Sequence, residues 1–384
     1  MAGRPNGVKR SILAVTALAL IFLVNFLSCA NTADSETLRV RVARDADKTS
    51  LTVKGPYTLY ALGSDKIIKK GNDLDVILGE WGVDSPGLKV SPAKSGAVYL
   101  GKRRFRGDLD IVKHGDGSIV VINHVSLDDY LNGVMRNEVS ELWPMEALKA
   151  QAIAARTYAL YQRSVRKERD FDVTSDVYSQ VYGGIASERW RTGWAIRQTR
   201  SMVLTYGAKV LPAYYHAACG GHTEDASILW NIDLAPLKGQ RSVFCKASPH
   251  YNWSRDIKVS EIEASLQRAG YKIGNLRYMI LTERDASDRI MTIKLVGDQE
   301  LEVPAGDFRL ALGPNIIKST NFDIIDKGGY FRFRGKGWGH GVGMCQWCAY
   351  FLSKKGYRAH DILRFYYPGT EIVRSQGSGV RRSK

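Results

Sequence analysis

The chain has few acidic residues: 39 Asp and Glu stand against 55 Lys and Arg, so the formal net charge of its 384 residues is +16. It contains no zinc-finger, helix-turn-helix or aromatic-rich single-strand-binding pattern, so nucleic acid is not the expected partner. No internal repeat is present either. The length and apolar content suit a globular protein with one large or two ordinary domains rather than a disordered chain.

The N-terminus has the pattern of a secretory signal. Three basic residues precede an apolar run at 12–27, which ends at Ser28-Cys29-Ala30. We therefore expect residues 1–29 to be a signal peptide. A lipidated Cys29 is one form of this expectation and cleavage after Ala30 is another, while an uncleaved membrane anchor is disfavoured because the run is short. In each case the working part of the chain is exported to the cell envelope.

The exported part stays strongly basic, because removal of Arg4, Lys9 and Arg10 lowers the net charge from +16 only to about +13. Basic exported proteins meet anionic polymers of the envelope, so such a polymer is the expected partner. The basic tail at 371–384 is expected to be solvated and disordered.

The hydrophobic pattern predicts an α+β fold. Short alternating runs fill residues 36–125 and indicate an antiparallel β-rich region, which a helical part follows to about Val165. Strands and helices then mix without a regular βαβ alternation, which favours a mixed or antiparallel β core with a long central helix and small β-rich lobes. We expect this core at 126–255 and 323–370, with an inserted α+β lobe at 256–322.

Glu138 lies just before a strong helix signal. Pro144 favours the first turn of a helix, and residues 146–161 are rich in Ala and Leu with no Gly or Pro. Lys149 and Arg156 are seven positions apart, so they share one face of this helix. They either need an anionic partner or ligand, or only extend their charged ends to water.

A second segment contains five glycines in nine residues, at 335–343. Such a density is not compatible with a packed strand or helix and indicates unusual backbone angles or close backbone approach. His340 lies in the middle of this loop, and Trp338 and Trp347 flank it with broad apolar faces that suit sugar rings. A single histidine is more often structural, but this position favours a function.

These two segments resemble the SpoIID/LytB family, that of stage II sporulation protein D and the amidase enhancer. The first is similar to the family's signature around Glu138, and the second to its glycine-histidine-glycine-valine-glycine motif. Further similar stretches stand between them in the expected order: Asp176-Val-Tyr178-Ser-Gln180-Val-Tyr182-Gly-Gly, Tyr214–Glu224 and Val303–Arg309. The resemblance covers roughly residues 38–367.

The resemblance implies binding or cleavage of peptidoglycan glycan strands. Glu138 aligns with the family residue that carries lytic transglycosylase activity, in which one carboxylic acid protonates the glycosidic oxygen. The carboxylate then accepts the proton of the sugar's 6-hydroxyl, which closes an anhydro-muramyl ring, whereas ordinary glycosidases need two carboxylates. Glu141 is the rival acid and is expected to cap a helix or face solvent. The alternative is a non-catalytic binding protein, an enhancer of a cell-wall amidase.

A general acid works best when burial raises its pKa, whereas nearby cations lower it. Lys149 and Arg156 are therefore expected to contact substrate or to pair with Glu146, and not to hold Glu138 ionised. The other residues expected to bind substrate are polar or aromatic: Tyr178, Gln180, Tyr182, His216, Trp338, His340 and Gln346. A scaffold role is the alternative for His216 and His340 and the preferred one for Thr223.

Four cysteines beyond Cys29 allow a structural zinc site. Cys345 and Cys348 have the two-residue gap of a zinc knuckle, and Cys219 and Cys245 could complete a tetrahedral set of thiolates.

Disulfides are the competing interpretation, because they are the default in an exported chain. Either the four cysteines form two disulfides, or one disulfide accompanies a metal bound by His216, Cys219, His222 and Cys245.

Overall fold

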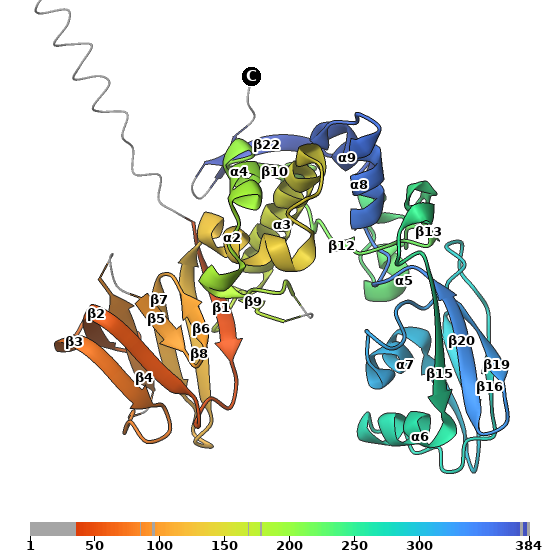
Figure 1. The fold of residues 1–384 in the computed structure, drawn as a ribbon, viewed down its shortest axis with the longest axis horizontal. Coiled ribbons are helices and arrows are strands. Elements are labelled where there is room, and N and C mark those ends of the chain that lie inside the picture. Colours follow the sequence, from red (N-terminus) through yellow and green to blue (C-terminus); the bar gives the residue numbers. More distant parts are fainter. Residues whose placement is uncertain are drawn as a thin grey trace, which may run out of the picture.

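The computed structural model describes residues 36–84, 86–93, 97–167, 169–176, 179–376 and 379–381. The expected signal peptide, Cys29 and Tyr178 lie outside these ranges. Within them, no helix combines the length and the apolar character that a membrane span requires. Helices and strands are both abundant, and they mix irregularly, so the predicted α+β class is confirmed. Figure 1 shows a strand-rich part at one end, helices in the middle and a second α+β lobe at the other end.

A nine-stranded sheet forms the N-terminal part. Its strands follow the order β6-β5-β2-β4-β7-β8-β1-β9, with β3 paired to β2. The bounds are β1 Thr37–Ala43, β2 Ser50–Ala61, β3 Ile67–Ile77, β4 Gly87–Pro92, β5 Ala97–Leu100, β6 Arg103–Phe105, β7 Asp108–Lys113, β8 Ile119–Ser126 and β9 Val173–Thr174. In β1, Leu38, Val40 and Val42 are buried while the residues between them are not, as the period of a strand requires.

Two helices connect this sheet to the middle of the molecule. Helix α2 (Leu127–Glu138) begins after Ser126, whose side chain accepts a hydrogen bond from the Asp129 backbone, and it carries acidic residues in its first turn. Helix α3 (Met145–Val165) begins after Pro144. The last residue of α2 is therefore Glu138, and six residues separate it from the start of α3.

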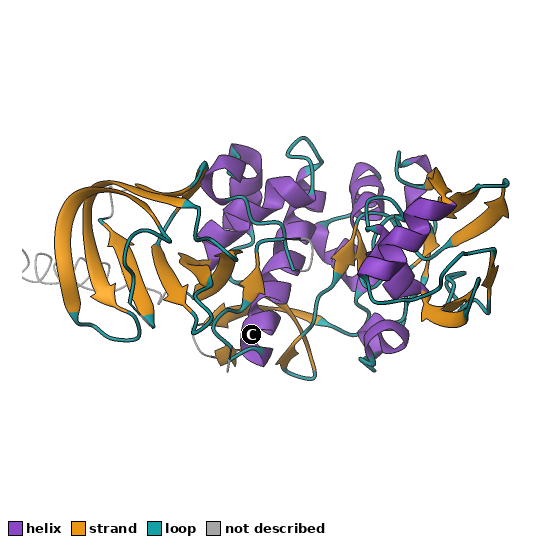
Figure 2. Ribbon diagram, turned by 90° about the horizontal axis from the view of Figure 1, so that it is seen from below, coloured by secondary structure: helices purple, strands orange, loops and turns teal. Residues whose placement is uncertain are grey.

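Helix α3 is the long central helix that the sequence predicted. Ala152, Ala155 and Ala159 pack into the apolar core of the N-terminal sheet. Ala150 and Ala154 pack on the opposite side, into a second core shared with the C-terminal helices. Small side chains allow other elements to approach α3 closely on both sides, which explains its composition. Figure 2 shows helices gathered in the middle, with strands mainly toward the two ends.

Short elements follow α3 and extend the middle of the molecule. They are η1 Gly184–Ser187, α4 Trp190–Gln198, β10 Met202–Tyr206, β11 Lys209–Val210, β12 Tyr215–His216, β13 Gly221–His222, α5 Ala226–Trp230, η2 Ala235–Leu237, β14 Arg241–Ser242 and η3 Phe244–Ala247.

The second lobe has its own apolar core and two three-stranded sheets, β15-β20-β19 and β16-β17-β18. Its elements are β15 Asn252–Lys258, α6 Val259–Arg268, β16 Tyr278–Leu281, β17 Thr292–Val296, β18 Glu300–Pro304, α7 Ala305–Leu312, β19 Phe322–Asp326 and β20 Tyr330–Lys336. The lobe thus extends beyond the expected limits of 256–322. Phe331 and Phe333 of β20 complete its core, and for that reason the boundary expected after residue 322 is wrong.

The chain then returns to the middle of the molecule. These last elements are β21 Met344–Cys345, α8 Gln346–Lys354, α9 Ala359–Tyr366, β22 Glu371–Gln376 and β23 Gly379–Arg381. Strand β21 pairs in parallel with β12, so the lobe is inserted between two neighbouring strands. The expectation of a disordered tail from residue 371 is wrong, because β22 pairs antiparallel with β10. Val373 is buried in that sheet and supplies the apolar contact that orders the segment.

Candidate functional site

A cavity of about 740 Å³ lies where the end of α2, the β12 segment, helix α7 and the glycine-rich loop meet. Both motifs that the sequence singled out line it, Glu138 from the first and Trp338, His340 and Gln346 from the second. Glu138 is the only carboxylate among the described residues that form its wall. A single acid at the meeting point of two distant motifs makes this cavity the candidate active site.

The Glu138 carboxylate has no cation as a partner among the described residues. Its Oε1 accepts a hydrogen bond from the Val181 backbone N–H at 3.1 Å, and its Oε2 accepts one from Gln346 Nε2 at 3.5 Å. Burial raises the pKa of Glu138 to about 7, although these two hydrogen bonds oppose the shift. Near neutral pH the group can therefore both donate and accept a proton, as a general acid and base must.

Tyr215 lies beside Glu138, held by a buried polar network. Gln180 is 1% exposed; its Nε2 donates to the Tyr215 hydroxyl at 2.7 Å, and its Oε1 accepts from the Tyr130 hydroxyl at 3.0 Å. Gln180 was expected to bind substrate, but it does not line the cavity and instead fixes the tyrosine that does. Burial raises the pKa of Tyr215 well above its ordinary value, so its hydroxyl keeps its proton.

His340 lines the cavity, but both of its ring nitrogens are used within the protein. Nδ1 accepts a hydrogen bond from the Val342 backbone N–H at 3.1 Å, so Nε2 carries the proton and donates it to the Tyr215 carbonyl at 2.9 Å. Burial, together with the charge of Arg309, lowers the pKa of His340 to about 3. The ring is therefore neutral and positions Tyr215, which is the scaffold alternative considered from the sequence.

His216 has one free nitrogen. Its Nδ1 donates to the Val342 carbonyl at 3.1 Å, which leaves Nε2 as an unprotonated acceptor. This atom is buried and has no hydrogen-bond partner among the described residues. Burial and the neighbouring His340 and Arg289 lower the pKa of His216 well below its ordinary value. His216 is thus a neutral acceptor in the cavity wall, able to receive a hydroxyl or amide N–H.

The glycines allow the loop to approach the β12 segment closely. Gly343 has φ +72°, and a Cβ there would stand 2.0 Å from the Tyr214 carbonyl oxygen. Gly341 has φ +90°, and a Cβ there would stand 2.6 Å from the guanidinium of Arg289. Both requirements, a left-handed backbone and close contact, explain why this stretch is so rich in glycine.

Aromatic rings form much of the apolar wall. Trp338 and Trp347 both line the cavity, as does Trp143. The ring of Trp347 packs against Trp143 at 5.1 Å between centroids, while the Lys318 ammonium lies 4.6 Å from the Trp338 ring. Flat faces of this kind fit the apolar faces of sugar rings.

The cationic groups of the cavity are not those expected from the sequence. Arg136 and Arg309 line it, and Arg309 also donates to the backbone carbonyls of Lys318 and Pro314. Burial lowers the pKa of Arg309 to about 10, so it stays charged at neutral pH. Arg309 lies in one of the stretches that carry the family resemblance, and that was the only signal for it.

Lys149 and Arg156 do not line the cavity. Lys149 Nζ donates to Glu146 Oε1 at 2.8 Å, one of the alternatives foreseen for it. Arg156 is 1% exposed and donates to the Thr199 carbonyl at 2.8 Å, with Asp128 at 3.4 Å. Because this guanidinium anchors the end of α4, the prediction that it contacts substrate is not met in the structure.

The remaining expected residues lie around the site rather than in it. Tyr182 is buried, and its hydroxyl donates to Asn123 Oδ1 at 3.0 Å, so it does not line the groove as expected. Thr223 is buried and bonded to the Gln240 backbone, consistent with the scaffold role preferred for it. Glu141 pairs with Arg189 at 3.6 Å and is not part of the cavity wall.

A buried ion pair joins the second lobe to the wall of the site. Arg289 and Glu224 are each about 1% exposed and lie 3.8 Å apart, with Ser287 donating to the same carboxylate oxygen at 2.9 Å. Arg289 also donates to the backbone carbonyls of Cys219 and His222. Burial raises the pKa of Glu224 to about 7, opposed by the charge of Arg289.

Four buried cysteines lie next to the cavity. The sulfur atoms of Cys219, Cys245, Cys345 and Cys348 all lie within 4.8 Å of one another, and none forms a disulfide. Among the described residues they form the one group of His, Cys, Asp and Glu side chains with the spacing of a metal site.

Comparison with known proteins decides the family. Residues 115–206, which contain α2 and Glu138, match the family described as stage II sporulation protein. A Brachyspira hyodysenteriae protein that bears only the description uncharacterized is 32% identical over 356 residues, or 89% of this chain and 94% of its own length. Stage II sporulation protein D of Bacillus subtilis is 29% identical over 301 residues, or 74% of this chain and 84% of its own. The chain belongs to the SpoIID family.

The resemblance found in the sequence is thereby confirmed. The amidase enhancer of Bacillus subtilis is 25% identical over 63% of this chain but only 40% of its own length. Residues 235–343, which include the second lobe, match a family described only as a domain of unknown function. The match to the stage II sporulation protein family thus covers Glu138. The second lobe and the glycine-rich loop, which complete the cavity, fall largely in the match to the domain of unknown function.

Proposed function

We propose that the chain is exported to the cell envelope and cleaves peptidoglycan glycan strands as a lytic transglycosylase. The observation that carries this proposal is the isolation of Glu138 in a cavity whose described lining residues include no second carboxylate. Hydrolytic glycosidases need two carboxyl groups flanking the scissile bond, whereas an intramolecular transfer to the sugar's own hydroxyl needs one.

In the proposed reaction, protonated Glu138 donates its proton to the glycosidic oxygen as the bond from that oxygen to C1 breaks. The resulting carboxylate then accepts the proton of the 6-hydroxyl as its oxygen attacks C1. The products are a strand with a free 4-hydroxyl and a strand with a 1,6-anhydro end, and Glu138 is protonated again. A pKa of about 7 suits both halves of this cycle.

The cavity wall offers contacts that suit an N-acetylated sugar carrying a carboxylate. The free Nε2 of His216 can accept an acetamido N–H or a hydroxyl, and Trp338 can stack on a ring face. Arg136 and Arg309 supply positive charge for a lactyl carboxylate. We assign Arg136 and Arg309 the role in carboxylate binding that the sequence suggested for Lys149 and Arg156.

The test uses the purified chain with isolated glycan strands, with and without stem peptides, and mass spectrometry of the products. We expect anhydro-ended fragments from the wild type and a fall of about 10²–10⁴-fold for Glu138→Gln, with strand binding retained. Glu141→Gln is the matched control, since it removes a carboxylate three residues away that lies outside the cavity. The activity should also decline above pH 7, where Glu138 loses the proton it must donate.

The similarity to an amidase enhancer favours a second candidate, a glycan-binding protein that stimulates a cell-wall amidase without chemistry of its own. In that case neither the wild type nor Glu138→Gln would yield anhydro ends, whether or not the glycan strands carry stem peptides. Both would then stimulate the amidase equally, and the lytic proposal would be abandoned.

A further inference from the structure

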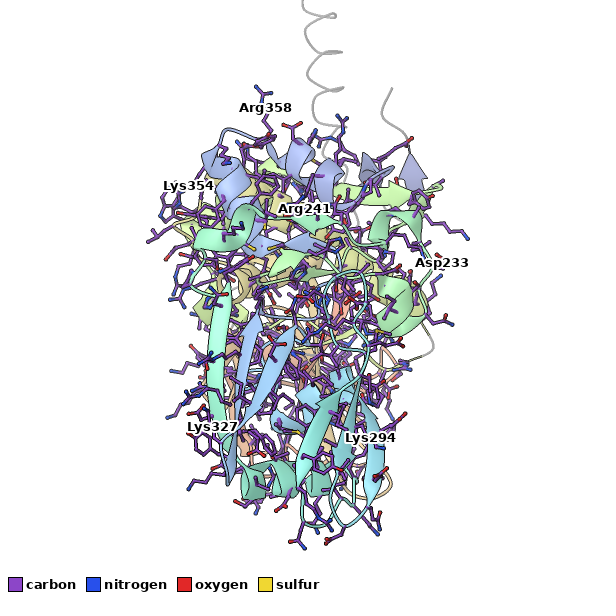
Figure 3. The ribbon with its side chains drawn as sticks, turned by 90° about the vertical axis from the view of Figure 1, so that its right-hand side faces the viewer. Asp233, Arg241, Lys294, Lys327, Lys354 and Arg358 are labelled. Carbon is purple, nitrogen blue, oxygen red and sulfur yellow. The ribbon has the colours of Figure 1, made fainter. Side chains whose placement is uncertain are left out.

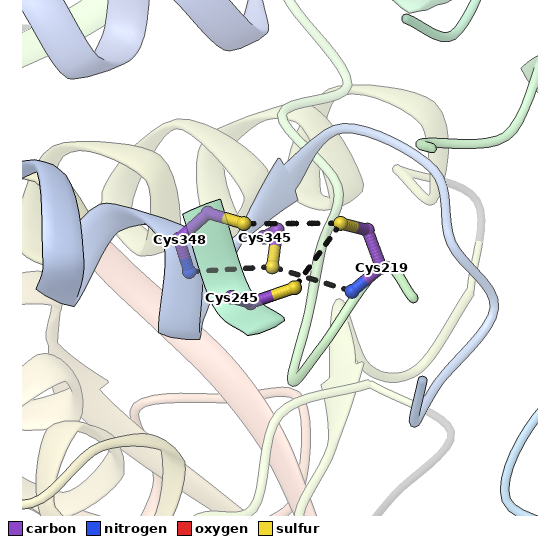
Figure 4. Close-up of side chains that lie close together, drawn as sticks. All are labelled: Cys219, Cys245, Cys345 and Cys348. Carbon is purple, nitrogen blue, oxygen red and sulfur yellow. Dashed lines mark hydrogen bonds between the residues drawn. The ribbon is translucent and has the colours of Figure 1, made fainter. Parts of the chain in front are cut away.

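The cysteine cluster draws together parts of the chain that are far apart in sequence. Cys219 follows β12, Cys245 lies in the short helix η3, Cys345 ends β21, and Cys348 lies in the first turn of α8. All four are at most 1% exposed. Figure 4 shows their side chains converging from these separate segments on one small volume. Clustered thiols in a protein interior need a physical reason, since any apolar residue would fill the space equally well.

The spacing of the sulfur atoms fits a metal ion better than two disulfides. Cys219 Sγ lies 3.5 Å from that of Cys245 and 3.8 Å from that of Cys348, and no two of the four are more than 4.8 Å apart. A tetrahedron with zinc–sulfur bonds of ~2.3 Å has sulfur–sulfur edges of about 3.8 Å. Two disulfides would instead divide the atoms into two bonded pairs.

We propose that Cys219, Cys245, Cys345 and Cys348 bind a zinc ion as four thiolates. Soft sulfur ligands select zinc over calcium and magnesium, which take oxygen ligands. With four protein ligands the tetrahedral shell is complete, so the ion has a structural role and no open position for chemistry.

Hydrogen-bond donors around the sulfurs support thiolate ligands. The backbone N–H groups of Cys219 and Cys348 both donate to Cys345 Sγ, at 3.3 and 3.4 Å, and that of Gly221 donates to Cys219 Sγ at 3.4 Å. The Ser242 hydroxyl lies 3.3 Å from Cys348 Sγ. Donors that point at ligand atoms fix their orientation and stabilise their negative charge. The Cys219 thiol, which donates to the Ser242 carbonyl at 3.1 Å, would lose that proton on binding.

The two histidines considered as alternative ligands each use one ring nitrogen, Nδ1, within the protein. His222 Nδ1 donates to the Thr223 carbonyl at 2.7 Å, and His216 uses its Nδ1 on Val342. Neither is in the group of side chains whose ligand atoms converge. The mixed histidine and cysteine site is therefore not the one that the fold assembles.

The proposed ion would fix one wall of the cavity. Cys345 directly precedes Gln346, which donates to Glu138, and the Trp347 backbone N–H donates to the Ala217 carbonyl at 3.0 Å. The ion would thus join the loop that carries Gln346 to the segment that carries His216 and Ala217. This consequence for catalysis depends on the proposed function, but the presence of the metal does not.

The experiment measures metal and thiols on the full chain, purified without added metal or reductant. We expect elemental analysis to find one zinc ion per chain. A mercurial that captures thiolates should release it, and each of the four clustered cysteines should be labelled by maleimide once the chain is unfolded in chelator. Exchange for cobalt should give the intense absorption bands of a tetrahedral thiolate site.

Cys345→Ser and Cys348→Ser should each lower the zinc content to near none, while Cys29→Ser, which changes a cysteine that is not one of the four proposed ligands, should leave it unchanged. If the serine variants fail to fold, the zinc and thiol content of the wild type still decides the question. A chain without metal overturns the proposal, whether its mass is lowered by two disulfides or its thiols are free. Because no glycan is involved, failure here is distinct from failure of the lytic assignment.

Discussion

At the scale of single residues, the site depends on one carboxylate kept out of water. The unfolded chain would titrate Glu138 near its ordinary value of 4.5, whereas burial in the fold raises that pKa to about 7. Between these values the folded state retains a proton that the unfolded state has lost. Folding stability contributed by this group is therefore present below about pH 4.5 and decreases as the pH rises toward 7.

Glu138→Gln should accordingly stabilise the fold in a pH-dependent manner. The amide carries no charge to desolvate, so we expect the variant to gain about 1–3 kcal/mol over the wild type at pH 8 and little at pH 4. Urea unfolding at the two pH values measures the difference. Glu141→Gln is the control and should change stability by less than about 1 kcal/mol. An equal effect of Glu138→Gln at both pH values would show that the carboxyl is not desolvated in the fold.

Residue identity alone could locate Glu138 and the glycine-rich loop, because each lies in a contiguous and unusual pattern. It could not locate Arg309, since a single arginine in the second lobe reaches the cavity only through the packing of helix α7. For Lys149 and Arg156 the sequence erred in the opposite direction, because it suggested a contact with substrate although neither residue lines the cavity. Their spacing correctly placed them on one face of a helix, but a helical period does not tell which neighbouring element covers that face.

At the scale of elements, the conformation of the loop between β20 and β21 is set by the segments that its backbone must pass closely. Gly343 combines a positive φ with contact against the Tyr214 carbonyl, whereas Gly356, between α8 and α9, has φ +91° with no atom within 4 Å of a Cβ. The two glycines therefore share the conformational requirement and differ only in the contact.

Alanine at these two positions should separate the two effects. We expect Gly356→Ala to cost about 1 kcal/mol, from the left-handed backbone alone. Gly343→Ala should cost more than about 3 kcal/mol, because the loop must also move away from Tyr214. Chemical denaturation of both variants gives the comparison. Equal losses would show that close approach does not constrain the loop.

The elements themselves were largely predictable, since the helix at 146–161 and the strand alternation before 125 have strong local periods. The limits of the second lobe could not be predicted from the sequence. Strands β15 and β20 are distant in sequence and pair only in the folded chain, so no local pattern marks β20 as part of the lobe. Likewise, residues 371–376 form a strand because they pair with β10, which is distant in sequence.

At the scale of the whole molecule, basic side chains outnumber acidic ones, and one buried ion pair among the described residues joins the lobe to the middle. Basic side chains such as Lys327, Lys354 and Arg358 project outward in Figure 3. Arg289, by contrast, is enclosed between the lobe and the glycine-rich loop, where Glu224 is its only nearby carboxylate partner among the described ion pairs.

Arg289→Met should weaken the attachment of the lobe. It leaves the Glu224 carboxylate buried without its cation, which costs about 3–5 kcal/mol at pH 8. At pH 5 the loss should be smaller, because Glu224, whose pKa burial already raises to about 7, is then protonated. Thermal unfolding at both pH values tests this expectation. Arg332→Met, which removes an exposed pair with Asp256 in the same lobe, is the control and should cost below about 1 kcal/mol.

The parallel pairing of β12 with β21 has a consequence for the order of folding. The whole second lobe lies between these two strands in the sequence. Bringing β12 and β21 together closes this long segment into a loop, which costs conformational entropy. A lobe that has already folded shortens the flexible part of the segment and so lowers that cost. Contacts at such sequence separation form late. The lobe should therefore collapse first, and the cavity should be completed last. Until the C-terminal quarter of the chain is available to supply the glycine-rich loop and β21, the wall of the cavity should therefore stay incomplete.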